Sequence, residues 1–385
     1  MKKVLKKGLK IIGIILAVIL IILLCVYLFV LQYPKLKKNP KEGKWYKITS
    51  SDMLCADGSQ YKAFFKKGSE NKVLVYFAGG GSNIDEYTAR EGLFNSSVLY
   101  TDYVCNFSMN MGGIATASED NPFKDWSVIA FPCATGDFMT GKGEFKYTDN
   151  NGKEQTVIHH GYTNYNIIMQ EIMAKAGIDN SDTVLVTGYS AGGFSAALLS
   201  DDIYTNYFPN AASKNVLIDA SLLEYEGWHN VLTDVWHTPS SISDISVTDN
   251  LALDCIRNLK EKYGDDITVL FDSSTRDGDL AKSQNYFDNG VMEVDEQIAD
   301  AYQEMLKQNI PVFQAAGAYL FIWDGLQYYD DTRNMTMHTI IATPYCYHRF
   351  DGQGLSIVEW AYNAVNGDPK DYGLDLVDKV YEKTE

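Results

Sequence analysis

The hydrophobic pattern of the chain begins with one long apolar run. Residues 11–32 (IIGIILAVILIILLCVYLFVLQ) contain no charged residue. A helix of this length spans roughly 30 Å, which is the thickness of the hydrocarbon core of a bilayer. Five lysines precede the run in residues 1–10, and more lysines follow it. We therefore predict a transmembrane signal anchor at 11–32 after a cytoplasmic basic tail at 1–10.

A cleaved signal peptide is the alternative reading of this segment. The run is longer than a usual signal-peptide core, and no small-x-small cleavage site follows it, which favours an uncleaved anchor. Residues 33–44 are polar and short, as expected of a juxtamembrane linker. These features predict a single-pass protein of the cell membrane, with residues 45–385 as an extracytoplasmic domain.

Beyond residue 45, short apolar runs alternate with helical periodicity. The apolar runs predict six strands, at 72–78, 126–132, 183–187, 215–220, 267–272 and 339–342. The spacing of apolar positions predicts helices at 162–176, 191–199, 251–263, 294–307 and 356–365. Nearly continuous apolar strands that alternate with amphipathic helices are typical of an α/β fold, with a mostly parallel sheet covered by helices on both faces.

Composition and charge narrow the class of protein. The 385 residues, 46% of them hydrophobic, are enough for one large domain in addition to the anchor. The net charge is −17, and it becomes −22 once the five lysines of the N-terminal tail are set aside. Such a surface repels polyanions, so we exclude nucleic acid as a partner.

The cysteines indicate no metal site. Five lie outside the predicted anchor, and no two of them form a CxxC pair. We therefore predict neither a metal nor a cofactor. In an oxidising compartment one or two disulfides can form, and buried free thiols are the equal alternative. These cysteines are Cys55, Cys105, Cys133, Cys255 and Cys346.

The sequence Gly188-Tyr189-Ser190-Ala191-Gly192 matches the G-x-S-x-G pattern of a nucleophile elbow. The pattern alone is weak, and a serine in an ordinary strand-to-helix turn is the alternative. The context strengthens it, because the apolar run TVLVT precedes the pattern and the helical GFSAALLS follows it. We therefore predict that Ser190 is a nucleophile and that the N–H of Ala191, at a helix start, stabilises an oxyanion.

A glycine run ends the first predicted strand of the main domain. Gly79, Gly80 and Gly81 allow the backbone to approach a ligand closely. Together with Ser82, this segment is predicted to supply the second half of an oxyanion hole. A plain surface loop is the alternative.

A serine nucleophile needs a histidine base and an acid that orients it, and α/β-hydrolases place these later in the chain, the acid first. The candidate acids follow the strand at 267–272. His348 lies beyond the strand predicted at 339–342, whereas His338 precedes that strand and would lie at its wrong end. We therefore predict that His348 is the base. The candidate acids are Asp272, Asp277 and Asp279. His229 and His237 also follow Ser190, but they precede these acids, which argues against them as the base.

Six ordered segments between Asp57 and Arg349 resemble the pectin acetylesterase family, the family of the Notum carboxylesterases. They are DGSQYKAFFKKGSENKVLVYFAGGG, NPFKDWSVIAFPCATGDF, HHGYTNYNIIMQEI, VTGYSAGG, LIDAS and YCYHRF. The resemblance implies an α/β-hydrolase that cleaves O-acyl esters without metal or cofactor. By position it implies Ser190 as the nucleophile, Asp277 as the acid and His348 as the base, with Gly80, Gly81 and Ala191 in the oxyanion hole.

The chain departs from the family pattern at Ser82-Asn83, where relatives often carry Trp or Cys, and it lacks several of the family's disulfide cysteines. The acidic surface is poorly suited to polygalacturonate. The expected substrate is therefore an acylated, most simply acetylated, neutral glycan or a small ester. Two other functions remain open, a non-catalytic surface binding protein on a hydrolase scaffold and a lipase or peptidase, because the triad fixes the chemistry and not the substrate.

Overall fold

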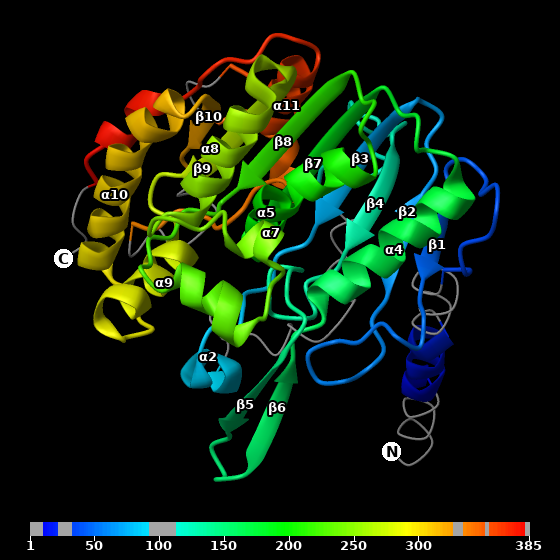
Figure 1. Ribbon diagram of the computed structural model, residues 1–385, viewed down its shortest axis with the longest axis horizontal. Coiled ribbons are helices and arrows are strands. Elements are labelled where there is room, and N and C mark those ends of the chain that lie inside the picture. Colours follow the sequence, from blue (N-terminus) through cyan, green and yellow to red (C-terminus); the bar gives the residue numbers. More distant parts are fainter. Residues whose placement is uncertain (1–10, 22–32, 92–112, 326–333, 351–353, 382–385) are drawn as a thin grey trace.

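The computed structural model describes residues 11–21, 33–91, 113–325, 334–350 and 354–381. Its centre is an eight-stranded sheet in the order β1-β2-β4-β3-β7-β8-β9-β10 (Figure 1). The strands are β1 (Trp45–Ile48), β2 (Ala63–Lys66), β3 (Lys72–Phe77), β4 (Ser127–Phe131), β7 (Thr183–Tyr189), β8 (Ser213–Asp219), β9 (Ile267–Ser274) and β10 (Ala318–Trp323). A separate hairpin is formed by β5 (Glu144–Thr148) and β6 (Glu154–Ile158).

Strands β4, β3, β7, β8, β9 and β10 pair in parallel, whereas β2 is antiparallel to both β4 and β1. The predicted mostly parallel sheet is therefore confirmed. All carboxyl ends of the parallel strands meet at one edge of the sheet, where open α/β folds bind their ligands.

Helices and loops cover both faces of the sheet, and the burial pattern of β3 shows why. Val73, Val75 and Phe77 enter one core, and Leu74 and Tyr76 enter the other, as the two-residue period of a strand requires. Residues of α4, α5, α8 and α10 belong to the first core, and residues of α11 to the second (Figure 1). A strand apolar on both sides is stable only between two such layers.

The helices range from one turn to more than five. They are α2 (Glu86–Glu91), α4 (Gly161–Ala176), α5 (Ala191–Asn206), α6 (Trp228–Asn230), α7 (Ser240–Ser243), α8 (Leu251–Tyr263), α9 (Gly278–Asn289), α10 (Glu296–Ala315) and α11 (Ile357–Val365). Short 3₁₀ or π turns lie at Val231–Val235, Gly264–Asp266, Pro344–Tyr347 and Leu374–Asp378.

Five of the six predicted strands are confirmed, and so are the five helices, with shifts at their ends. The strand predicted at 339–342 is wrong, because these residues form turns that precede a 3₁₀ helix. Ile340 and Ile341 are fully buried, as in a strand, but their N–H groups bond to the side chain of Asp219 and not to a neighbouring strand. The last strand of the sheet is β10.

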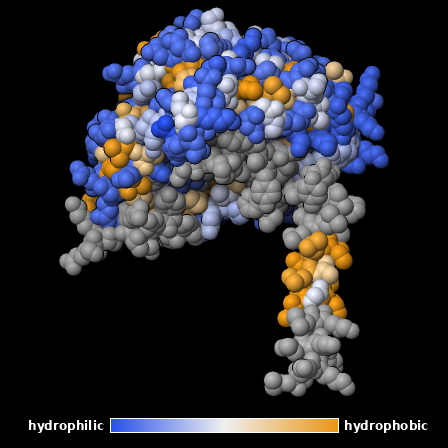
Figure 2. Space-filling model, turned by 90° about the horizontal axis from the view of Figure 1, so that it is seen from below, coloured by the Kyte–Doolittle hydropathy of each residue, from blue (hydrophilic) through white to orange (hydrophobic). Residues whose placement is uncertain are grey.

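The predicted anchor lies partly outside the described residues, since 1–10 and 22–32 are not described. Residues 11–21 are helical, and their large apolar side chains are exposed (Figure 2). Among the described residues, no helix is both long enough and apolar enough to cross a membrane.

The described residues include four of the five cysteines that lie outside the predicted anchor. Cys133, Cys255 and Cys346 are free thiols, and Cys255, Cys346 and Cys55 are buried. Cys105 lies outside the described residues. Of the two readings left open by the sequence, Cys133, Cys255 and Cys346 follow that of free thiols.

Candidate active site

Ser190 stands between β7 and α5 in a strained backbone conformation. Its φ of 55° and ψ of −127° place it in a region that side-chain-bearing residues rarely adopt. Its N–H donates to the carbonyl of Asp219 at the end of β8, at 2.8 Å. The strand, the sharp turn and the helix start are the geometry of a nucleophile elbow, which lifts the serine above the edge of the sheet.

Close packing explains the glycines of the elbow. A Cβ at Gly188 would come within 2.1 Å of the carbonyl oxygen of Gly192, and one at Gly192 would come within 2.1 Å of that of Phe77. A Cβ at Gly79 would lie 2.8 Å from the Cβ of Ser190. The glycine run after β3 therefore lies directly against the candidate nucleophile.

Asp277 follows β9 and begins α9. Its Oδ1 accepts the N–H groups of Asp279 and Leu280, at 3.1 and 2.9 Å, and so caps the helix. Its Oδ2 accepts a hydrogen bond from Nδ1 of His338 at 2.7 Å. The carboxylate is buried, and the imidazole side chain is only 14% exposed. Asp277 and His338 therefore form an acid–histidine pair whose orientation is fixed by the start of α9.

The charges around His338 decide its protonation. Burial alone lowers the pKa of this imidazole, but the carboxylates of Asp277, Asp279 and Asp219 outweigh burial and raise the pKa to about 9. Burial raises the pKa of Asp277, and the imidazole beside it opposes that rise. In its neutral form the ring keeps its proton on Nδ1, toward Asp277, which leaves Nε2 as the basic nitrogen.

The structure pairs Asp277 with His338 and not with the predicted base, His348. His348 follows the 3₁₀ helix at Pro344–Tyr347, where its N–H donates to the carbonyl of Tyr345 and its ring lies edge-on against Phe350, with ring centroids 5.0 Å apart. The sequence argues against His338 only if residues 339–342 form a strand. Since that segment is a loop, His338 lies in the connection after the last strand, where the base of such a triad is expected.

The three candidate acids lie in different places between β9 and the first turn of α9. Asp272 lies within β9, where its Oδ1 accepts a hydrogen bond from Nε1 of Trp323 at 3.2 Å. Asp279 lies in the first turn of α9, where it contributes charge near His338. Asp277 alone of the three has a hydrogen bond to a histidine among the described contacts.

Asp219 brings the serine and the histidine to the same edge of the sheet. Its backbone carbonyl accepts the N–H of Ser190 at 2.8 Å. Its Oδ2 accepts the N–H groups of Ile340 and Ile341, at 3.0 and 2.9 Å. The segment that carries His338 is therefore tied to the residue that also supports Ser190.

The predicted oxyanion region lies next to this edge. The N–H of Ala191 is the first of α5, and the first N–H groups of a helix have no partner within the helix. Gly81 has a φ of 87°, and its carbonyl accepts a hydrogen bond from the Cys133 thiol at 3.5 Å. The Ser82 hydroxyl is buried and has no hydrogen-bond partner among the described residues. The predicted donors of this loop directly follow Gly79, which lies against Ser190.

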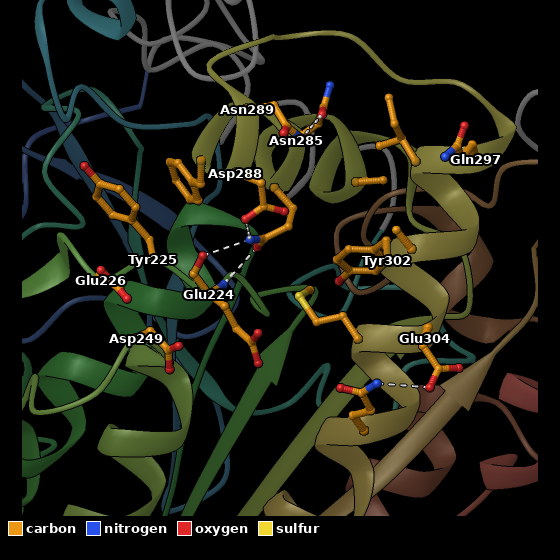
Figure 3. Close-up of a pocket in the computed structure, with 17 residues that line it drawn as sticks. Glu224, Tyr225, Glu226, Asp249, Asn285, Asp288, Asn289, Gln297, Tyr302 and Glu304 are labelled. Carbon is orange, nitrogen blue, oxygen red and sulfur yellow. Dashed lines mark hydrogen bonds between the residues drawn. The ribbon is translucent and has the colours of Figure 1, made fainter.

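A cavity of about 760 Å³ lies between α9, α10 and the segment after β8 (Figure 3). Asn285 and Asp288 reach it from α9, and Tyr302 and Glu304 from α10 (Figure 3). Burial and the nearby charge of Asp277 raise the pKa of the Tyr302 phenol well above its usual range. None of the three candidate catalytic residues lines the cavity. The described residues that line it include carboxylates and amides but no Lys or Arg.

The parallel sheet and the elbow define an α/β-hydrolase. A family model described as pectinacetylesterase matches residues 44–253, more than half of the chain. The chain therefore belongs to the pectinacetylesterase family, as the sequence resemblance predicted, and is a hydrolase that acts on esters. No group of three or more His, Cys, Asp or Glu side chains among the described residues is arranged to hold a metal ion.

Solved structures agree on the fold. The Wnt deacylase Notum from Drosophila, in one crystal form, is 14% identical with a TM-score of 0.57, covering 91% of this chain and 96% of its own. A second crystal form is 15% identical with a TM-score of 0.59, covering 88% of this chain and 96% of its own. No curated protein matches the chain in sequence.

Proposed function

We propose that this protein is a serine carboxylesterase in which Ser190, His338 and Asp277 form the catalytic triad. The hydrogen bond between Asp277 and His338, on a loop tied to the elbow through Asp219, is the observation that carries the proposal. His338 takes the role that the sequence predicted for His348. The elbow geometry of Ser190 and the family membership support ester hydrolysis at this site.

In the proposed mechanism, Nε2 of His338 takes the hydroxyl proton of Ser190 as the serine oxygen attacks the ester carbonyl. The carboxylate of Asp277 holds the ring in its tautomer and stabilises the imidazolium that forms. The N–H of Ala191 and donors of the segment Gly80–Ser82 bind the oxyanion. His338 then protonates the departing alcohol and later activates the water that releases the acid. One oxyanion donor contributes roughly 10²–10³ in rate.

The substrate we propose is an acyl ester of a neutral glycan, or a smaller ester, with acetyl as the simplest acyl group. The net charge of −22 beyond the N-terminal tail opposes an anionic polysaccharide. The structural neighbour from Drosophila is a Wnt deacylase, and removal of an acyl group is the same type of reaction.

We also propose that the enzyme is held at the cell membrane with its catalytic domain outside the cytoplasm. The uncharged run at 11–32, the lysines before it and the exposed apolar side chains of residues 11–21 support this. Membrane fractionation of the full chain and of a chain lacking residues 1–32 tests it. Both forms in the soluble fraction would exclude an anchor.

Labelling by a fluorophosphonate probe, combined with hydrolysis of p-nitrophenyl acetate, tests the catalytic proposal. Wild type should be labelled and active, and Ser190→Ala should be neither. His338→Ala should lower kcat by at least about 10³-fold, because the nucleophile loses its base. His348→Ala is the matched control and should stay close to wild type. Labelling of Ser190→Ala equal to wild type would refute Ser190, and the reverse order of the histidine variants would return the role to His348.

A further inference from the structure

Two buried carboxyl groups lie side by side in the middle of the site, and the triad uses neither of them. Asp219 ends β8, and its register partner in β9 is Asp272. Neighbouring strands are about 4.8 Å apart, and side chains in register point to the same face of the sheet. Both side chains are fully buried. Two carboxylates cannot both stay ionised at this separation without a large cost in free energy.

The hydrogen bonds of the pair leave one position for a proton. Oδ2 of Asp219 accepts two N–H groups, from Ile340 and Ile341, and Oδ1 of Asp272 accepts the indole N–H of Trp323. The two side chains are close enough for each to shift the pKa of the other. Their other oxygens, Oδ1 of Asp219 and Oδ2 of Asp272, are buried and receive no donor from another described group. A single proton between these two oxygens satisfies every atom of the pair.

We propose that Asp219 and Asp272 share one proton as a carboxylic acid–carboxylate pair, and that this pair positions the loop that carries His338. Asp272 donates the proton and Asp219 keeps the negative charge. The Asp219 carboxylate then binds the N–H groups of Ile340 and Ile341 in charge-assisted hydrogen bonds. The proposal rests on the proposed function, because the loop matters for catalysis only if His338 is the base.

The electrostatics agree with this assignment of the proton. Burial raises the pKa of Asp219 to about 6. Burial and the adjacent Asp219 charge raise the pKa of Asp272 well above its ordinary value. At neutral pH the proton therefore resides on Asp272. The other titratable groups that face the pair are His338, Asp277 and the Cys346 thiol.

Counting donors predicts how asparagine substitutions behave. In Asp272→Asn, the amide N–H₂ replaces the acid proton and the charge stays on Asp219. In Asp219→Asn, the amide oxygen still accepts the loop N–H groups and the amide N–H₂ donates to Asp272, so the charge moves to Asp272. The double variant has one donor too many, because one amide N–H₂ must face either the loop N–H groups or the indole of Trp323.

Hydrogen exchange of the backbone amides of 338–342 in the full-length protein tests the loop independently of activity. Asp272→Asn should match wild type. The double variant should exchange at least about tenfold faster, since one buried donor is left unsatisfied, with kcat lower and KM little changed. The proposal would be overturned if these amides exchanged at the wild-type rate in the double variant. It would also be overturned if they exchanged as fast in Asp272→Asn as in the double variant.

The charge and the proton of the Asp219–Asp272 pair can each be followed by a separate measurement. The alkaline midpoint of the pH–kcat/KM profile should stay in place in Asp272→Asn and fall in Asp219→Asn, because only the latter moves the negative charge away from Asp219, which raises the pKa of His338, to Asp272. Difference infrared spectra at pH 8 should show a protonated carboxylic acid in wild type that disappears in Asp272→Asn. Absence of that band in wild type would overturn the shared proton. This result does not depend on whether a variant folds, because it is measured on wild type. An active Ser190→Ala would instead refute the catalytic proposal and leave the infrared and exchange results standing.

Discussion

At the scale of single residues, Asp277 combines two tasks through its two oxygens. Oδ1 caps α9, and Oδ2 holds His338. Asn can keep the cap, but it presents an N–H₂ group to Nδ1 and so favours the wrong imidazole tautomer. Ala removes both functions.

Asp277→Asn is therefore expected to lower kcat by about 10⁴-fold with little change in stability. Asp277→Ala should lose the same activity and an additional 0.5–2 kcal/mol, roughly, of unfolding free energy, as for other helix caps. Urea denaturation and ester hydrolysis measured on both variants check this. Retained activity in Asp277→Asn would show that Asp277 orients no base.

The environment of His338 predicts an alkaline pH profile. Burial opposes its positive charge, but the surrounding carboxylates raise its pKa to about 9. A general base acts in its neutral form, so kcat/KM should rise about tenfold per pH unit between pH 6 and 8 and level off near 9. The profile is measured with a neutral ester and corrected for the hydrolysis seen with Ser190→Ala. A plateau already reached at pH 7 would contradict the raised pKa.

At the scale of elements, the elbow depends on contact between the start of α5 and the end of β3. Ala is normally favoured over Gly in a helix by about 1 kcal/mol. In Gly192→Ala, however, the new Cβ would lie 2.1 Å from the carbonyl oxygen of Phe77, a backbone atom that cannot move alone. The variant should lose at least about 2 kcal/mol of unfolding free energy and most of its activity.

Gly152→Ala is the control for the elbow prediction. Gly152 also has a restrictive backbone, with a φ of 76°, but a Cβ there meets no atom within 4 Å. It should cost only about 1–2 kcal/mol of backbone strain and leave activity intact. A Gly192→Ala variant as stable as wild type would show that α5 can withdraw from β3.

The central elements could be predicted because buried parallel strands are continuous apolar runs and their helices have an apolar stripe. Residues 339–342 misled the prediction because burial of Ile340 and Ile341 has the same sequence signature in a loop as in a strand. Their N–H groups bond to Asp219, a residue about 120 positions away, and no local pattern reports such a partner. Recognising the apolar run at 318–323 as a strand would have placed His338 after the last strand.

The residues of the site differ in the same way, because some have a local sequence signature and others depend on distant partners. Ser190 and the glycines carry local signatures, because a strained turn and close packing require particular residues at fixed spacing. The pairing of Asp277 with His338 spans 61 residues and depends on where a loop folds back. Asp219 and Asp272 each look like an ordinary acid at a strand end, and only the register of β8 with β9 reveals them as neighbours.

At the scale of the whole molecule, the acidic surface should discriminate between substrates. The chain beyond its N-terminal tail carries −22, and the described residues lining the cavity between α9 and α10 include no Lys or Arg. This negative field repels a polyanionic ester, whereas it exerts no net repulsion on a neutral acetylated oligosaccharide. Salt screens the field, since the Debye length falls from roughly 30 Å at 0.01 M to about 8 Å at 0.15 M.

We therefore expect kcat/KM for acetylated polygalacturonate to increase as salt is raised over this range, and that for a neutral acetylated oligosaccharide to stay nearly constant. Acetate release from the two substrates, measured with the same enzyme preparation and with Ser190→Ala as the blank, checks this. If acetylated polygalacturonate reacted fastest at low salt, a local basic groove would have to outweigh the net charge. The proposed preference for neutral substrates would then be wrong, even with the triad unchanged.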